Sequence, residues 1–233
     1  MEARFQAARE KAKRAGKLQR FDEFVEVVEK SSVTVAVPAQ FGLSLVTNEA
    51  TQFVNYEKLV GAGVRAPAGL QDDSKRRAVA GALFPSFGEK ISYGVLAIAN
   101  RGLPSYGDIY FRLKPKAIAH RCTFLERNSF DFLEQNGGGE WPLGYMSDWN
   151  SRSRLASAKL VDEIIAGKGV DDWDEILVQS DGRRENDDFI EAHVFGTFNL
   201  HSIEDVRPAE GTSDVRTKQL VELTLAAFEA ETG

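Results

Sequence analysis

The chain has 233 residues with a formal net charge of −6, 42% hydrophobic residues and a single cysteine, Cys122. This length and composition are typical of one globular domain, alone or with an extension, and one cysteine excludes an internal disulfide framework. An acidic chain is also a poor candidate for non-specific binding to nucleic acid, because neutralising phosphates requires a surplus of lysine and arginine.

No segment of the sequence has the composition of a targeting peptide or a membrane span. Residues 1–20 are rich in Lys and Arg but lack the apolar run of a signal peptide. No run approaches the roughly 18 apolar residues that a spanning helix needs. We therefore expect a cytoplasmic protein without a membrane anchor, which would need separate machinery for delivery if it acts in the cytosol of a target cell.

The chain is predicted to begin with a helix over residues 2–30 that has a weak point at Gly16. The second half of this helix carries an apolar stripe with three- and four-residue spacing, formed by Leu18, Phe21, Phe24, Val25 and Val28. We interpret residues 1–31 as a helical N-terminal extension and residues 32–233 as the main domain.

Two more helices and one strand are predicted before residue 84. In residues 32–37, valines alternate with smaller residues and most side chains are β-branched, which indicates a short strand that ends at Pro38. A helix capped by Thr47 is expected over 48–60, and a shorter one over 73–83.

Strands dominate the middle and later parts of the sequence. They are expected at 91–99, 108–113, 119–125, 175–179, 188–195 and 198–201. A helix over 151–166 with Gly167 as its C-cap separates them, and a last amphipathic helix follows its cap, Asp214. This order predicts an α+β fold with a mostly antiparallel sheet and helices at both ends.

The most informative local pattern is the strand 188–195. Alternate residues of a strand share a face, so Ile190, Ala192 and Val194 suit the core. Glu191 and His193 then point the other way, between two phenylalanines. A sheltered carboxylate beside an imidazole can hold a charge or move a proton. The alternative is a half-exposed strand face on which the two residues only pair with each other.

Several short motifs occur in an order that resembles ADP-ribosyltransferase-like domains of bacterial polymorphic toxins and effectors. The resemblance covers roughly residues 32–206, including a charged helix at 72–86. The matching motifs are Tyr93-Gly94, Tyr106-Gly107, Leu113-Lys114-Pro115, Arg121-Cys122-Thr123-Phe124, Asn128-Ser129 and Ile190-Glu191-Ala192-His193.

The resemblance implies an enzyme that consumes NAD as a substrate and needs no metal. Glu191 would stabilise the oxocarbenium-like ribose as nicotinamide leaves, and His193 would orient the substrate or act as a base. The cofactor-binding candidates are Tyr93, Gly94 and Tyr106, with Arg65 or Arg101 neutralising the diphosphate. Such toxins act on a macromolecular acceptor and are accompanied by a neutralising immunity protein.

The chain also departs from the family pattern. The strand at 32–37 has neither His nor Arg, and residues 61–70 lack the expected serine. Phe189 occupies the position where arginine-modifying members carry Glu or Gln, so a protein arginine is not a supported acceptor.

Two further interpretations remain open from the sequence. One is a non-catalytic interaction module on the same fold, and the other is a metal-independent ribonuclease-like toxin that uses Glu191 with His193 or His120. The spacing of His120, His193 and His201 predicts no metal site.

Overall fold

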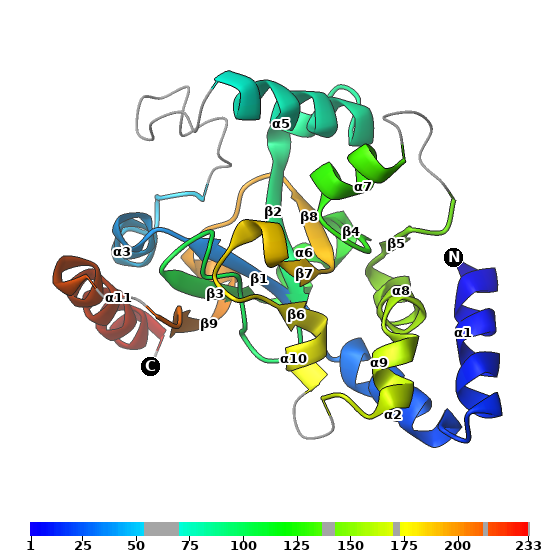
Figure 1. Ribbon diagram of the computed structural model, residues 1–233. Coiled ribbons are helices and arrows are strands. Elements are labelled where there is room, and N and C mark those ends of the chain that lie inside the picture. Colours follow the sequence, from blue (N-terminus) through cyan, green and yellow to red (C-terminus); the bar gives the residue numbers. More distant parts are fainter. Residues whose placement is uncertain (54–69, 137–142, 170–172, 212–213, 233) are drawn as a thin grey trace.

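The computed structural model describes residues 1–53, 70–136, 143–169, 173–211 and 214–232 (Figure 1). Within these residues, seven strands form one antiparallel sheet in the order β5-β4-β8-β2-β1-β3-β9, and two more form a small ribbon, β6-β7. The predicted α+β class with an antiparallel sheet is therefore confirmed. The strands are β1 (Ser32–Val37), β2 (Ile91–Ala97), β3 (Ile109–Leu113), β4 (Cys122–Leu125), β5 (Met146–Asp148), β6 (Val178–Gln179), β7 (Asp188–Phe189), β8 (Glu191–Phe195) and β9 (Ile203–Pro208).

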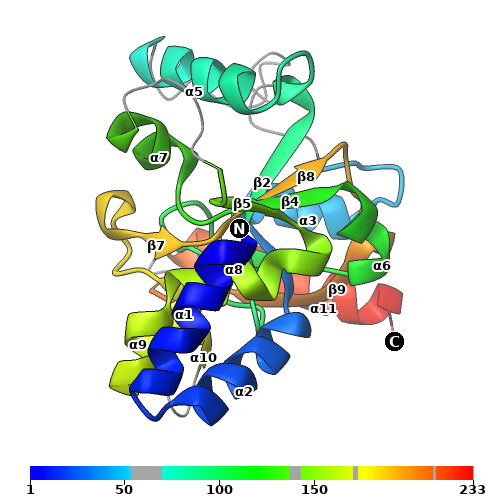
Figure 2. The same ribbon diagram turned by 90° about the vertical axis from the view of Figure 1, so that its right-hand side faces the viewer.

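The helices gather in three groups around the sheet. Helices α3 and α11 pack on each other, α1 and α2 pack with α8 and α9, and α5 and α7 lie together above β2, β4 and β8 (Figures 1 and 2). None of the described helices is long and apolar enough to cross a membrane. Their bounds are α1 (Glu2–Arg14), α2 (Leu18–Glu29), α3 (Ala39–Thr47), α5 (Leu70–Leu83), α6 (Pro115–Ile118), α7 (Ser129–Gln135), α8 (Arg152–Lys159), α9 (Val161–Ala166), α10 (Trp173–Leu177) and α11 (Val215–Thr232).

The N-terminal helices share the main hydrophobic core. Gly16 separates α1 from α2 with a φ of 70°, which matches the weak point expected there. Phe21 and Phe24 of α2 are fully buried, and Ala12 of α1 is buried in the same cluster. Arg4 also anchors α1 to the segment after β4, through a 2.6 Å ion pair with Glu126. Residues 1–31 thus contribute to the core of the sheet domain, while the domain boundary at residue 31 stays a prediction.

The prediction of a helix over 48–60 is wrong for residues 48–53, the part that the structure describes. A helix begins earlier instead, as α3 after Pro38, and Thr47 is its last residue rather than the cap of the next helix. The Thr47 hydroxyl donates to the carbonyl of Leu43, one turn back, so it satisfies the end of α3. Residues 48–53 are not helical, and the rest of the expected helix, 54–60, lies outside the described residues.

Three expectations for the later strands need correction. The strand expected over 188–195 is divided at Ile190 into β7 and β8, which belong to different sheets. Most of 175–179 belongs to α10, so only Val178 and Gln179 form β6. The stretch 198–201 makes only an isolated bridge, between Phe53 and Phe198. The chain instead adds β9 at the edge of the sheet, where its charged residues and its final proline suit a strand with one unpaired side.

The two faces of the sheet differ in what covers them. The main core occupies one face and includes Val33, Phe111 and Val194. The other face carries a smaller apolar cluster that includes Val95 and Phe189. Polar side chains also lie on this second face, so it is the face on which a site could form.

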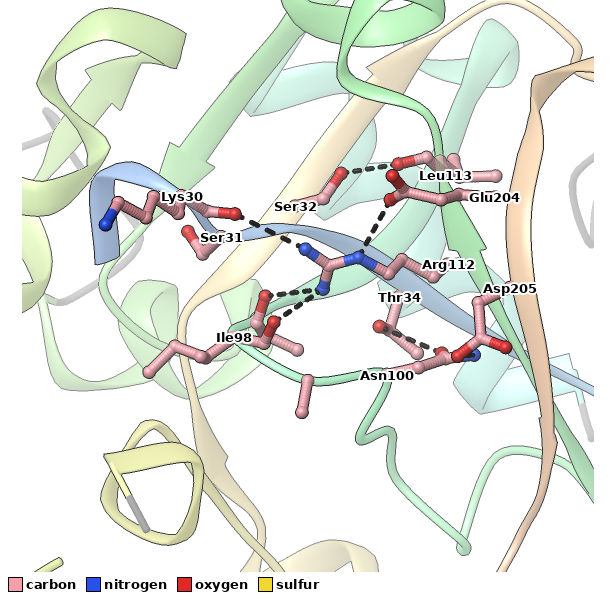
Figure 3. A network of polar contacts seen from close by, with 12 residues as sticks. Lys30, Ser31, Ser32, Thr34, Ile98, Asn100, Arg112, Leu113, Glu204 and Asp205 are labelled. Atoms are coloured by element: carbon pink, nitrogen blue, oxygen red, sulfur yellow. Dashed lines mark hydrogen bonds and ion pairs between the residues drawn. The ribbon is translucent and has the colours of Figure 1, made fainter. Parts of the chain in front are cut away.

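Arg112 of β3 organises the second face at the β1–β3–β9 end (Figure 3). Its guanidinium donates to the carbonyls of Ala97 and Ile98 at the end of β2 and to the carbonyl of Lys30. It also forms a 2.9 Å ion pair with Glu204 of β9. One side chain therefore ties β2, β3 and β9 to the segment that precedes β1.

Candidate active site

Strand β8 places Glu191 and His193 in the middle of the sheet. Glu191 pairs with Val95 of β2, and His193 pairs with Tyr93 of the same strand. Ala192 and Val194 lie in the main core on the opposite face. The predicted division of this strand into a core face and a Glu–His face is therefore confirmed.

Both oxygens of the Glu191 carboxylate have hydrogen-bond partners. Oε1 lies 2.7 Å from Nε2 of His193, and Oε2 accepts from the backbone N–H of Ser129 at 3.4 Å. Ser129 opens α7, and the side chain of Asn128 caps that helix by accepting from the backbone N–H of Phe130. The position of the carboxylate is thus fixed by β8 and by the start of α7 together.

The pair is buried, which differs from the half-exposed strand face that the sequence alternative assumed. Glu191 is 6% exposed and His193 is 1% exposed. Helices α5 and α7 cover this part of the sheet (Figure 1). Burial and the charge of Glu134 raise the pKa of Asp131 in α7, and Glu191 is a smaller cause in the same direction.

Aromatic rings surround the imidazole. The ring of Phe84, which follows α5, lies 4.9 Å from the His193 ring, and the Tyr93 ring lies 5.5 Å from it, both in edge-to-face arrangements. An ionised carboxylate can only accept, so in the tautomer with the proton on Nε2 the imidazole donates this hydrogen bond to Glu191. The other nitrogen, Nδ1, is buried and has no hydrogen-bond partner among the described residues.

The structure brings Tyr106 close to this pair and places Gly94 differently. The Tyr106 hydroxyl accepts from the side chain of Asn128 at 3.4 Å, and its ring packs on the cluster that contains Val95. Gly94 pairs with Ala192 on the opposite face. A Cβ on Gly94 would lie 2.7 Å from a backbone oxygen of β1, so this glycine permits close packing of the two strands.

Of the two arginines predicted to hold a diphosphate, only Arg101 lies within the described residues. Arg65 lies outside the described residues. Arg101 follows β2, where its positive charge opposes the rise in the pKa of Tyr110 that burial causes. Tyr110 belongs to β3, which is three strands from β8 in the sheet.

Another arginine, Arg184, was missed by the sequence analysis. Its guanidinium carbon lies 4.6 Å from the centre of the Tyr106 ring, and its Nε donates to the carbonyl of Ser105 at 3.2 Å. These contacts join the loop before β7 to the loop after β2. The periodicity of a sequence reports only neighbours along the chain, so it could not predict a contact between such distant segments.

The remaining reactive candidates lie apart from the Glu–His pair or are inert. His120 is exposed in the short 3-10 turn before β4, which lies toward the Phe195 end of β8. Burial raises the pKa of the Cys122 thiol to about 12, so this cysteine is a poor nucleophile. No group of three or more His, Cys, Asp or Glu side chains within the described ranges could hold a metal ion.

No family model and no curated protein matches the chain.

Proposed function

We propose that the protein is an NAD-consuming ADP-ribosyltransferase-like enzyme, a toxin or effector domain in which Glu191 stabilises the ribosyl cation. The observation that carries this proposal is the fixed carboxylate of Glu191, held by His193 and by the backbone N–H of Ser129 in a buried, aromatic-lined position. The antiparallel sheet and the order of the sequence motifs along it support the same fold type.

The chemistry requires a negative charge beside the ribose. The bond between the ribose C1′ and the nicotinamide nitrogen breaks, its electron pair leaves with nicotinamide, and positive charge develops on C1′ and the ring oxygen. A pre-positioned carboxylate in a weakly screened environment stabilises that charge in the transition state. An acceptor nucleophile then bonds to C1′ and releases its proton.

His193 and Tyr93 have supporting roles in this proposal. The Nε2–H bond of His193 to Oε1 orients the carboxylate and keeps the second oxygen toward Ser129. The ring of Tyr93, half-buried beside the imidazole, offers a stacking surface for a flat heterocycle. The acceptor is a macromolecule other than a protein arginine, and a neutralising immunity protein is the expected partner of such a toxin.

The test is nicotinamide release from NAD by wild-type protein and by Glu191→Gln. The glutamine keeps the shape of the side chain and removes the charge, so we expect release to fall by at least about 100-fold. Glu126→Gln is the matched control, because Glu126 is also a buried carboxylate at 4% exposure and is instead paired with Arg4. It should retain release wherever it remains folded.

Two results would contradict the proposal. One is the absence of release from folded wild-type protein, with or without cell lysate as a source of acceptor. The other is equal release by wild type and Glu191→Gln. Release that increases with lysate distinguishes a transferase from an enzyme that transfers ADP-ribose to water.

The burial of the pair favours a second candidate, a non-catalytic interaction module on the same fold. At 6% and 1% exposure, Glu191 and His193 resemble a buried polar pair that fixes the packing of α7 on β8. This candidate predicts no NAD binding by the folded wild type. It also predicts that Glu191→Gln retains binding to a macromolecular partner, which a pull-down with the wild-type and variant proteins would measure.

A further inference from the structure

We infer that Arg184, held over the ring of Tyr106, binds the diphosphate of a nucleotide substrate beside the Glu191 site. The choice of a diphosphate rests on the proposed function, because NAD carries one between its two riboses. The inference assigns to Arg184 the role that the sequence suggested for Arg65 or Arg101.

Two contacts hold the guanidinium in place before any ligand arrives. Its central carbon lies 4.6 Å from the centre of the Tyr106 ring, and Nε donates to the carbonyl of Ser105. A cation over an aromatic face is attracted by the ring's electrons, and a fixed guanidinium loses less rotamer freedom when it binds phosphate.

The charge of Arg184 is left available by its surroundings. Within the described residues, its Nη1 and Nη2 make no hydrogen bond or ion pair, and the side chain is exposed. The neighbouring Arg183 differs, since its Nε and Nη2 both bind the carboxylate of Asp181 at 3.0 and 2.6 Å. The adjacent Glu185 is exposed and forms no ion pair with Arg184 in the described structure.

The nearby carboxylate of Asp187 also leaves Arg184 free. Its two oxygens accept from the hydroxyl groups of Ser105 and Ser180, rather than from an arginine. Within the described residues, Arg184 therefore keeps its Nη1–Nη2 edge open, and two N–H donors on one edge can bind two phosphate oxygens at once.

A short chain of contacts links this guanidinium to the proposed catalytic carboxylate. The Tyr106 hydroxyl accepts from Asn128, and the next residue, Ser129, donates its backbone N–H to Glu191. In NAD, the diphosphate is attached to the 5′ carbon of the ribose whose C1′ reacts. Arg184 on the Tyr106 ring and Glu191 therefore belong to one chain of contacts, as a ligand whose ribose lies at Glu191 and whose diphosphate lies at Arg184 would require.

The experiment is a calorimetric titration of ADP into wild-type protein, Arg184→Gln and Arg183→Gln. Loss of a charge-assisted contact to phosphate should weaken ADP binding by about tenfold or more in Arg184→Gln. Arg183→Gln removes the same charge from the same loop but should change the Kd by less than about twofold, because Asp181 already engages Arg183. Adenosine, which has no phosphate, should bind the wild type and Arg184→Gln equally weakly.

Each outcome decides the inference independently of the proposed enzyme activity. An equal loss in the two arginine variants, or no ADP binding by folded wild type, would overturn it, even if wild-type protein releases nicotinamide from NAD. A selective loss in Arg184→Gln supports a diphosphate site, and it does so even if no nicotinamide is released, in which case only the proposed reaction fails. Unchanged melting temperatures of both variants would show that folding does not cause the difference.

Discussion

Replacing Arg112 with methionine should destabilise the protein through lost backbone contacts rather than through a lost ion pair. Methionine keeps an apolar stem in place of the arginine stem, so packing of the chain beside the sheet changes little. The substitution removes the donors to the carbonyls of Ala97, Ile98 and Lys30 as well as the partner of Glu204 (Figure 3).

The magnitude follows from the exposure of each contact. The side chain of Arg112 is 14% exposed, whereas that of Glu204 is 47% exposed, so the ion pair contributes about 1 kcal/mol at most. Hydrogen bonds from a charged donor each contribute about 1.5–3 kcal/mol, but two of the three carbonyls share Nη1 and their contributions do not add fully. We expect Arg112→Met to lower the free energy of unfolding by about 3 kcal/mol.

Urea denaturation of wild type, Arg112→Met and Glu204→Gln measures the two contributions separately. Glu204→Gln should cost about 1 kcal/mol or less, and this cost should shrink at high salt because the pair is partly exposed. Equal losses in the two variants would refute the reasoning, since they would show that the ion pair, rather than the backbone contacts, carries the stabilisation.

Three further predictions concern single residues. A Cβ on Gly107 would lie 2.4–2.5 Å from backbone atoms of β1, so Gly107→Ala should lower the free energy of unfolding, measured with urea, by about 2 kcal/mol or more. The control is Gly81→Ala, where a Cβ would meet nothing within 4 Å and the stability should be unchanged or slightly higher. The raised pKa of Cys122, about 12, keeps its thiol protonated at pH 8, so a thiol reagent should react only at the rate of unfolding, and rapid labelling of folded protein would contradict this. His193→Leu leaves Oε1 of Glu191 without its donor and should lower the free energy of unfolding by about 1–3 kcal/mol, an expectation that a stable variant would contradict.

Local patterns in the sequence predicted which residues share a face, because strand and helix periods are local properties. The alternation of 188–195 correctly separated Glu191 and His193 from the core residues of β8. Gly16 and Gly167 both mark helix ends with positive φ, where glycine carries no steric penalty. Strand β1 has the bounds that its β-branched composition predicted.

The depth of the site could not be predicted in the same way. Alternation gives the direction of a side chain but not what covers it, and Glu191 and His193 are buried because α5 and α7 lie over β8. The contacts of His193 with Phe84 and of Arg184 with Tyr106 join segments that are distant in sequence. Such contacts depend on the whole topology, so no short motif predicts them.

The register of the sheet connects the Arg112 network to the candidate site. Arg112 lies opposite Thr34 of β1, Thr34 lies opposite Val95 of β2, and Val95 lies opposite Glu191 of β8. Directly opposed residues of an antiparallel pair share a face, so the guanidinium and the carboxylate belong to one row across the second face of the sheet.

Polar groups along this row are satisfied to different degrees. Thr34 bonds to Asn100, and Arg112 has four protein acceptors, so that end of the row is complete without a ligand. At the other end, within the described residues, His193 keeps Nδ1 buried without a partner. A buried polar atom without a partner costs free energy, and a bound water, an ion or a ligand group can each supply the missing hydrogen bond. The row therefore combines an end whose polar groups bond to one another and fix the register of β2 with an end at β8 where one buried nitrogen still has room for a further partner.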